Sequence, residues 1–96
     1  MTSLSTHVLD TERGRPAPGV RVDLHRDGEL VAEEKTDGDG RIADLLPGLE
    51  PGVYRLVFHP PSSFYRRIEL EIELGEGHTH VPLLVSSYAC VSYRGS

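Results

Sequence analysis

Three histidines are the side chains of this sequence best suited to proton transfer or metal binding. His78 and His80 are two positions apart, so in a strand both imidazoles project from the same face. An imidazole has an ordinary pKa of about 6.5, and can therefore take a proton from water and return it at neutral pH. His7 lies in LSTHVLD, where a serine or threonine would serve a structural strand equally well. These histidines suit an acid/base site or a zinc site, although two polar residues on an exposed strand would give the same spacing.

The chain ends in VSYRGS, a second group of chemically capable side chains. Tyr93, Arg94 and Ser96 stand where chains usually fray, and a frayed tail needs neither an aromatic ring nor a guanidinium. We therefore expect the tail to be held in place and to have a role.

A period of two along most of the chain predicts the elements that position these residues. In IELEIEL the apolar and acidic residues alternate strictly, which is typical of a half-buried strand, and VRVDLHR and VYRLVFH follow the same rule. Turn sequences such as RDGE and DGDG separate the strands. We expect strands near residues 4–9, 20–26, 30–36, 41–45, 53–58, 66–74, 79–86 and 89–94. Short strands at this spacing predict an all-β sandwich of two antiparallel sheets.

Length and charge restrict the kinds of partner. A chain of 96 residues predicts one domain over 1–96, and a net charge of −5 without a basic stripe argues against nucleic acid. No apolar stretch is long enough for a membrane span, and the amino end does not resemble a secretory signal, so we expect a cytoplasmic protein that does not bind membranes. The single Cys90 cannot form an internal disulfide.

The sequence DGDG at 37–40 resembles the start of a calcium loop. The bidentate carboxylate that such a loop needs at its twelfth position would fall on Gly48, so a turn explains these residues better.

The segments LSTHVLDTERGRPAPGVRVDL, DGDGR and HTHVPLLVSSYACVSYRGS resemble the 5-hydroxyisourate hydrolases, the transthyretin-related enzymes of purine breakdown. The resemblance covers nearly the whole chain and implies a prealbumin-like (transthyretin-like) β-sandwich of about eight short strands. It also implies that water attacks a ring carbonyl of 5-hydroxyisourate and opens the ring to 2-oxo-4-hydroxy-4-carboxy-5-ureidoimidazoline. Neither a metal nor an organic cofactor is implied.

The resemblance also implies the site residues. The catalytic ones are His7, Arg41, His80 and Ser96, and the substrate-binding ones are His7, Arg41, Tyr93 and Arg94. In such enzymes these residues line a cleft between two dimers of a homotetramer. The residue types suit the reaction: an imidazole can act as base and acid, and the arginine fork can bind planar carbonyls and a developing oxyanion. Which histidine is the base stays open.

This sequence departs from the family pattern in two places. In HPPSSFYRRIEL the connection after residue 58 passes almost directly into the next strand, without the usual short helix, and Arg66 replaces a proline. The tail has Ser87 and Cys90 where proline and tyrosine are usual. The generic middle of the chain and the trimmed connection leave a second possibility, a non-catalytic prealbumin-like binding or spacer module.

Overall fold

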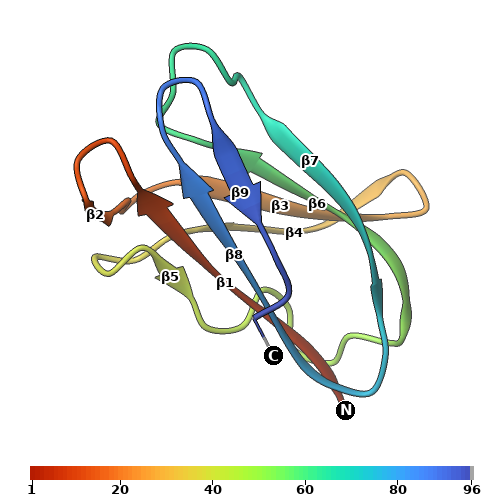
Figure 1. The fold of residues 1–96 in the computed structure, drawn as a ribbon. Coiled ribbons are helices and arrows are strands. Elements are labelled where there is room, and N and C mark those ends of the chain that lie inside the picture. Colours follow the sequence, from red (N-terminus) through yellow and green to blue (C-terminus); the bar gives the residue numbers. More distant parts are fainter. Residues whose placement is uncertain (96) are drawn as a thin grey trace.

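The computed structural model describes residues 1–95, and they form two β-sheets that face each other (Figure 1). The strands are β1 (Thr2–Asp10), β2 (Arg15–Pro16), β3 (Arg21–Arg26), β4 (Glu29–Lys35), β5 (Arg41–Ile42), β6 (Gly52–His59), β7 (Ile68–Leu74), β8 (Gly77–Val85) and β9 (Cys90–Ser92). Each predicted strand is present, several with shifted ends. The very short β2 lies outside the strands that the sequence predicts.

The first sheet has the order β2-β1-β8-β9, and β5 pairs with β1 beyond the end of β2. All its pairs are antiparallel except β1 with β8, which run parallel and side by side over their whole length (Figure 1). The predicted antiparallel β-sandwich of two sheets is confirmed, with this one parallel pair as the exception. A parallel pair cannot be joined by a tight turn, and here most of the chain lies between its two strands.

The second sheet has the order β4-β3-β6-β7 and is antiparallel throughout. Its β3–β4 hairpin turns at Asp27 and Gly28, whose φ angles are 53° and 80°, which confirms the tight turn predicted for RDGE. The alternating residues of β7 turn their apolar side chains toward the other sheet. The core between the sheets includes Leu4, Val8, Val22, Leu24, Tyr54, Leu56, Phe58, Leu74, Leu83 and Val85, all at most 2% exposed.

The connection between β6 and β7 contains no helix, as the sequence predicts, and is tied to the β8–β9 turn. The Ser62 hydroxyl donates to the Ser87 carbonyl at 3.2 Å, and the Tyr65 hydroxyl donates to the Tyr88 carbonyl at 3.1 Å. The rings of Phe64 and Tyr88 meet edge to face, with centroids 5.7 Å apart. These contacts fix the trimmed connection in place without a helix.

None of the elements described for residues 1–95 is a helix long and apolar enough to cross a bilayer.

Candidate active site

His7, Arg41 and His80 lie on the outer face of the first sheet. His7 on β1 stands opposite Arg41 on β5. The other edge of β1 pairs with β8, in a register that puts Ser5 opposite His80 and His7 opposite Pro82. With strands about 4.8 Å apart and a rise of about 3.3 Å per residue, the backbones of His7 and His80 lie about 8 Å apart on a diagonal. Since side chains two residues apart point the same way, the two imidazoles and the guanidinium can all reach one small ring.

The turn before β5 sets the position of Arg41. The Asp37 carboxylate accepts hydrogen bonds from the backbone N–H groups of Asp39 and Arg41, both at 2.9 Å. These bonds, and the charges of Arg41 and His7, lower the pKa of Asp37. The structure thus uses DGDG as a turn whose first carboxylate bonds its own backbone.

Gly40 lets this turn lie directly against β1. It has φ 75°, and a Cβ added there would lie 2.5 Å from the Val8 carbonyl oxygen, so a side chain would push the turn away. Val8 donates its N–H to the Gly40 carbonyl at 2.7 Å, and a ring nitrogen of His7 bonds the Asp39 carbonyl at 2.9 Å. The glycine and the aspartate therefore hold Arg41 beside His7.

His80 is partly buried, and its neighbours disfavour its charged form. Burial and the nearby charges of His7, His78 and Arg41 lower the pKa of His80 below its ordinary value. Its Nδ1 lies 2.7 Å from the Ser5 hydroxyl, and Nε2 has no hydrogen-bond partner among residues 1–95. A neutral imidazole with one free nitrogen is the form that a general base needs.

Residues 92–95 of the tail run beside β8, and Gly95 lies against His80. The Ser92 hydroxyl donates to the Pro82 carbonyl at 2.9 Å, and the Gly95 N–H donates to the His80 carbonyl at 2.6 Å. A Cβ added to Gly95 would lie 2.9 Å from Cδ2 of His80, so the backbone of the tail touches the imidazole edge. The expectation that the tail is held in place is thus met up to Gly95. Ser96, expected to be catalytic, lies outside the described residues.

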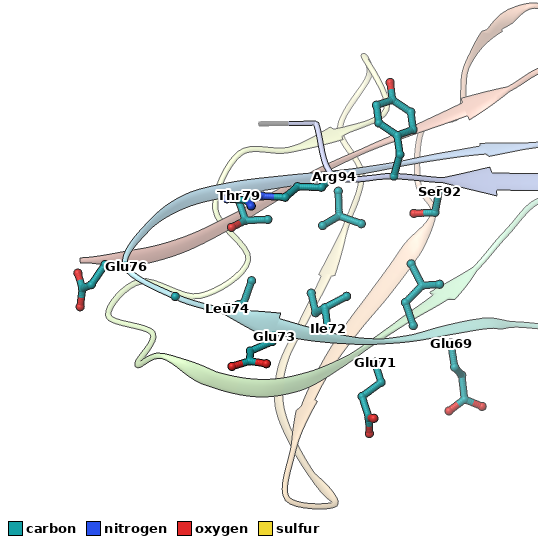
Figure 2. Close-up of a pocket in the computed structure, with 13 residues that line it drawn as sticks. Glu69, Glu71, Ile72, Glu73, Leu74, Glu76, Thr79, Ser92 and Arg94 are labelled. Atoms are coloured by element: carbon teal, nitrogen blue, oxygen red, sulfur yellow. The ribbon is translucent and has the colours of Figure 1, made fainter.

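Arg94 extends away from the histidines. It lines a cavity of about 650 Å³ at the open edge of the sandwich between β7 and β9, together with Thr79 and Val81 on the inner face of β8. In Figure 2, Ile72 and Leu74 face Arg94 and Thr79 across this cavity, whereas the glutamates of β7 point away. Tyr93 borders the same cavity and remains 53% exposed. Of the expected site residues, the structure brings together His7, Arg41 and His80, and it places Arg94 elsewhere.

Sequence reasoning overlooked Ser3 and Ser5, which bond His78 and His80 directly. Their two-residue spacing matches that of the histidines and could have indicated them. To pair the serines with the histidines, however, one must know the parallel register of β1 and β8. No three His, Cys, Asp or Glu side chains within residues 1–95 are grouped so as to hold a metal ion.

The chain is similar to known proteins over its full length. A 5-hydroxyisourate hydrolase of Caulobacter vibrioides is 41% identical, with all of both chains covered, and "5-hydroxyisourate hydrolase 2" of Rhizobium meliloti is 39% identical over 97% of this chain and 95% of its own. The Caulobacter alignment spans 116 positions against 96 residues here, so at least 20 positions have no counterpart in this chain. Such gaps are consistent with a shortened connection.

Solved structures agree with this similarity. A Klebsiella pneumoniae 5-hydroxyisourate hydrolase superposes with a TM-score of 0.94 at 37% identity, covering all of both chains. A sea bream transthyretin in complex with thyroxine superposes with a TM-score of 0.82 at 26% identity, covering 95% of this chain and 92% of its own. These matches confirm the prealbumin-like sandwich. The model of the HIUase/Transthyretin family matches residues 4–95, and the chain belongs to that family.

Proposed function

We propose that this protein hydrolyses 5-hydroxyisourate to 2-oxo-4-hydroxy-4-carboxy-5-ureidoimidazoline, a step of urate breakdown, within a single domain over residues 1–96. The observation that carries the proposal is the convergence of His7, Arg41 and His80 on one face of the first sheet. Full-length relatives that bear the name of this hydrolase support the choice of substrate.

His80 has the environment of a general base, because its charged form is disfavoured and its Nε2 is free of partners within residues 1–95. In the proposed reaction, water bound between His80 and the substrate gives its proton to Nε2 as its oxygen attacks a ring carbonyl. Arg41, directly opposite His7, offers fork-shaped donors to the oxygen that gains negative charge. A proton then returns to the departing ring nitrogen as the ring opens.

Ser96 completes the proposed site. It directly follows Gly95 in the sequence, and the backbone of Gly95 contacts His80. We assign it the task of orienting the attacking water. Tyr93, half exposed on the same tail, is a candidate to contact the substrate ring.

We further propose a homotetramer, a dimer of dimers, with the sites between dimers. Its support is that β7 and β9 are edge strands of the two sheets and line the same cavity. Unpaired strand edges are templates for pairing with another copy. Light scattering after size exclusion checks the count, and a monomeric active protein would contradict it. A cytoplasmic location stays part of the proposal, and cell fractionation tests it.

The direct test follows the near-ultraviolet absorbance of freshly generated 5-hydroxyisourate against its spontaneous decay. We expect the purified chain, its intact tail verified by mass, to accelerate the decay strongly. We expect deletion of Ser96 to remove most of the acceleration while the far-ultraviolet circular dichroism stays unchanged. A chain with an intact tail that gives no acceleration would refute the proposal.

The cavity between β7 and β9 favours a second candidate, a binding module for an apolar small molecule. Its volume of about 650 Å³ is within the range of ligand pockets, roughly 300 to 1,000 Å³, and apolar side chains of β7 line it. This candidate predicts tight binding of an apolar aromatic compound and no hydrolysis, so the same absorbance assay separates the two functions.

A further inference from the structure

Four side chains form a continuous row of hydrogen bonds from His80 to the protein surface. Ser5 Oγ lies 2.7 Å from Nδ1 of His80 and 2.7 Å from Nε2 of His78, and Ser3 Oγ lies 2.6 Å from Nδ1 of His78. Each of these distances is that of a short, well-formed hydrogen bond. The row begins at the partly buried His80 and ends at the exposed His78 and the half-buried Ser3.

The parallel register of β1 and β8 produces this row. Ser3 stands opposite His78 and Ser5 opposite His80, so two serines and two histidines alternate on the outer face of the sheet. The small hydroxyl side chain of Ser5 bonds both imidazoles and is 8% exposed. A slip of the register by one residue would turn both serines to the core and break the row.

The donors and acceptors of the row allow two complete arrangements. A hydroxyl donates one hydrogen and also accepts, and a neutral imidazole donates from one nitrogen and accepts at the other. In the outward arrangement His80 Nδ1–H donates to Ser5, Ser5 donates to Nε2 of His78, and His78 Nδ1–H donates to Ser3. In the inward arrangement every bond is reversed. The first leaves Nε2 of His80 as an acceptor toward the substrate, and the second makes it a donor.

We propose that Ser5 and His78 are positioning residues that set the tautomer of His80 and carry a proton between His80 and solvent. The inference deepens the proposed function and rests on it. In the first half of the reaction, Nε2 of His80 takes a proton from water while its Nδ1 proton passes to Ser5. The Ser5 proton moves to Nε2 of His78, and the Nδ1 proton of His78 leaves through Ser3 to solvent. One proton enters the row and one leaves it.

The second half of the reaction reverses these transfers. Nε2–H of His80 gives its proton to the departing ring nitrogen, while Nδ1 regains one from Ser5 and the row is refilled from solvent at its outer end. His80 therefore remains neutral in both steps.

The charges around His80 explain why such a row is useful. His7 on β1, Arg41 on β5 and His78 on its own strand all face it, and Asp37 beyond Arg41 bonds its own turn rather than His80. Burial, and the repulsion that an imidazolium at His80 would meet from these neighbours, lower the pKa of His80 and so disfavour its imidazolium form. Proton loss at Nδ1 during proton gain at Nε2 avoids that form.

The test uses Ser5→Ala, with Ser5→Thr as the conservative variant that keeps a hydroxyl, and His25→Gln on the other sheet as a control. The ¹⁵N shifts of the His80 ring are measured by NMR at pH 8, without substrate. We expect Nδ1–H in the unaltered chain and in the Ser5→Thr and His25→Gln variants, and a change to Nε2–H in Ser5→Ala. A His80 tautomer that is the same with and without the Ser5 hydroxyl overturns the proposal, whether or not the protein turns out to be a hydrolase.

Kinetics give a second readout on the same variants. Ser5→Ala removes both hydrogen bonds of the Ser5 hydroxyl and should lower kcat about tenfold, with little change in KM, and Ser5→Thr should restore most of it. His78→Gln, which keeps a polar side chain but cannot relay a proton, lowers kcat to a similar extent. Unchanged kcat in both Ser5→Ala and His78→Gln, in a chain that hydrolyses the substrate, contradicts the relay while leaving the proposed function intact.

Discussion

Gly95→Ala should disable the site while leaving the fold almost unchanged. The new methyl group would lie 2.9 Å from Cδ2 and 3.4 Å from Cγ of His80 and 3.2 Å from its carbonyl oxygen. Carbon atoms in ordinary contact are about 3.5 to 4.0 Å apart, so the tail and the imidazole must separate by roughly 0.5 to 1 Å.

The tail is the part that will move, because within residues 1–95 one backbone hydrogen bond, from Gly95 to His80 at 2.6 Å, holds it there. Loss of such a bond costs about 0.5 to 1.5 kcal/mol, whereas keeping an overpacked contact costs about 1 to 3 kcal/mol. The free energy of unfolding should therefore fall by at most about 1.5 kcal/mol. Because a misplacement of about 1 Å can cost on the order of a hundredfold in rate, we expect kcat/KM to fall at least tenfold.

The assay compares initial rates of 5-hydroxyisourate loss with urea unfolding of the same samples. Gly75→Ala is the matched control, since a Cβ added at that glycine, between β7 and β8, meets nothing within 4 Å. It should keep full activity. Gly95→Ala with unaltered activity would show that contact between the tail and His80 is unnecessary, and would refute this placement of the tail.

Three further predictions concern charge. Arg41→Lys keeps the charge but loses the forked donors, and should lower kcat/KM by about tenfold to a hundredfold in the absorbance assay; unchanged kinetics would remove Arg41 from the site. Because burial, His7, His78 and Arg41 lower the pKa of His80, the acidic limb of the kcat/KM profile should lie below pH 6.5, and a midpoint above that value would contradict a neutral base. Burial raises the pKa of Asp23, but hydrogen bonds from Arg21 and His59 outweigh it and lower that pKa below 3.8. Stability from Asp23 is thus present above pH 3.8 and lost as pH falls through its lowered pKa. Asp23→Asn should therefore lower the free energy of unfolding by about 1 to 2 kcal/mol at pH 7 and have less effect at pH 2 to 3. Equal effects at both pH values would argue against the ion pair.

Most of the fold could be predicted because its strands and turns follow local sequence patterns. Alternation in IELEIEL and the turn at Asp27 and Gly28 depend on neighbouring residues alone, and the structure agrees with both. The pairing of β1 with β8 could not be predicted from such patterns, because it joins residues about 75 positions apart, such as Ser5 and His80. Non-local pairing depends on the whole sandwich.

The same difference separates the residues of the proposed site that the sequence indicates from those that it does not. His7, Arg41 and His80 could be named because they fall in the motifs of the family that the sequence resembles. Ser5 could not, because serine is common in strands and its importance here comes only from its position between two rings. Arg94 was expected at the substrate by its place in the tail motif, whereas its side chain lines the cavity on the other side of the sheet.

We propose that hydrolysis takes place on the outer face of the first sheet. Thr79 and His80 are neighbours on β8 with opposite orientations: Thr79 lines the cavity, and His80 faces outward beside Ser5. The decisive measurement is the rate of 5-hydroxyisourate loss in His80→Ala compared with Thr79→Ala. We predict a rate close to spontaneous decay for His80→Ala and a rate close to that of the unaltered chain for Thr79→Ala. Full activity in His80→Ala, or its loss only in Thr79→Ala, would contradict the claim.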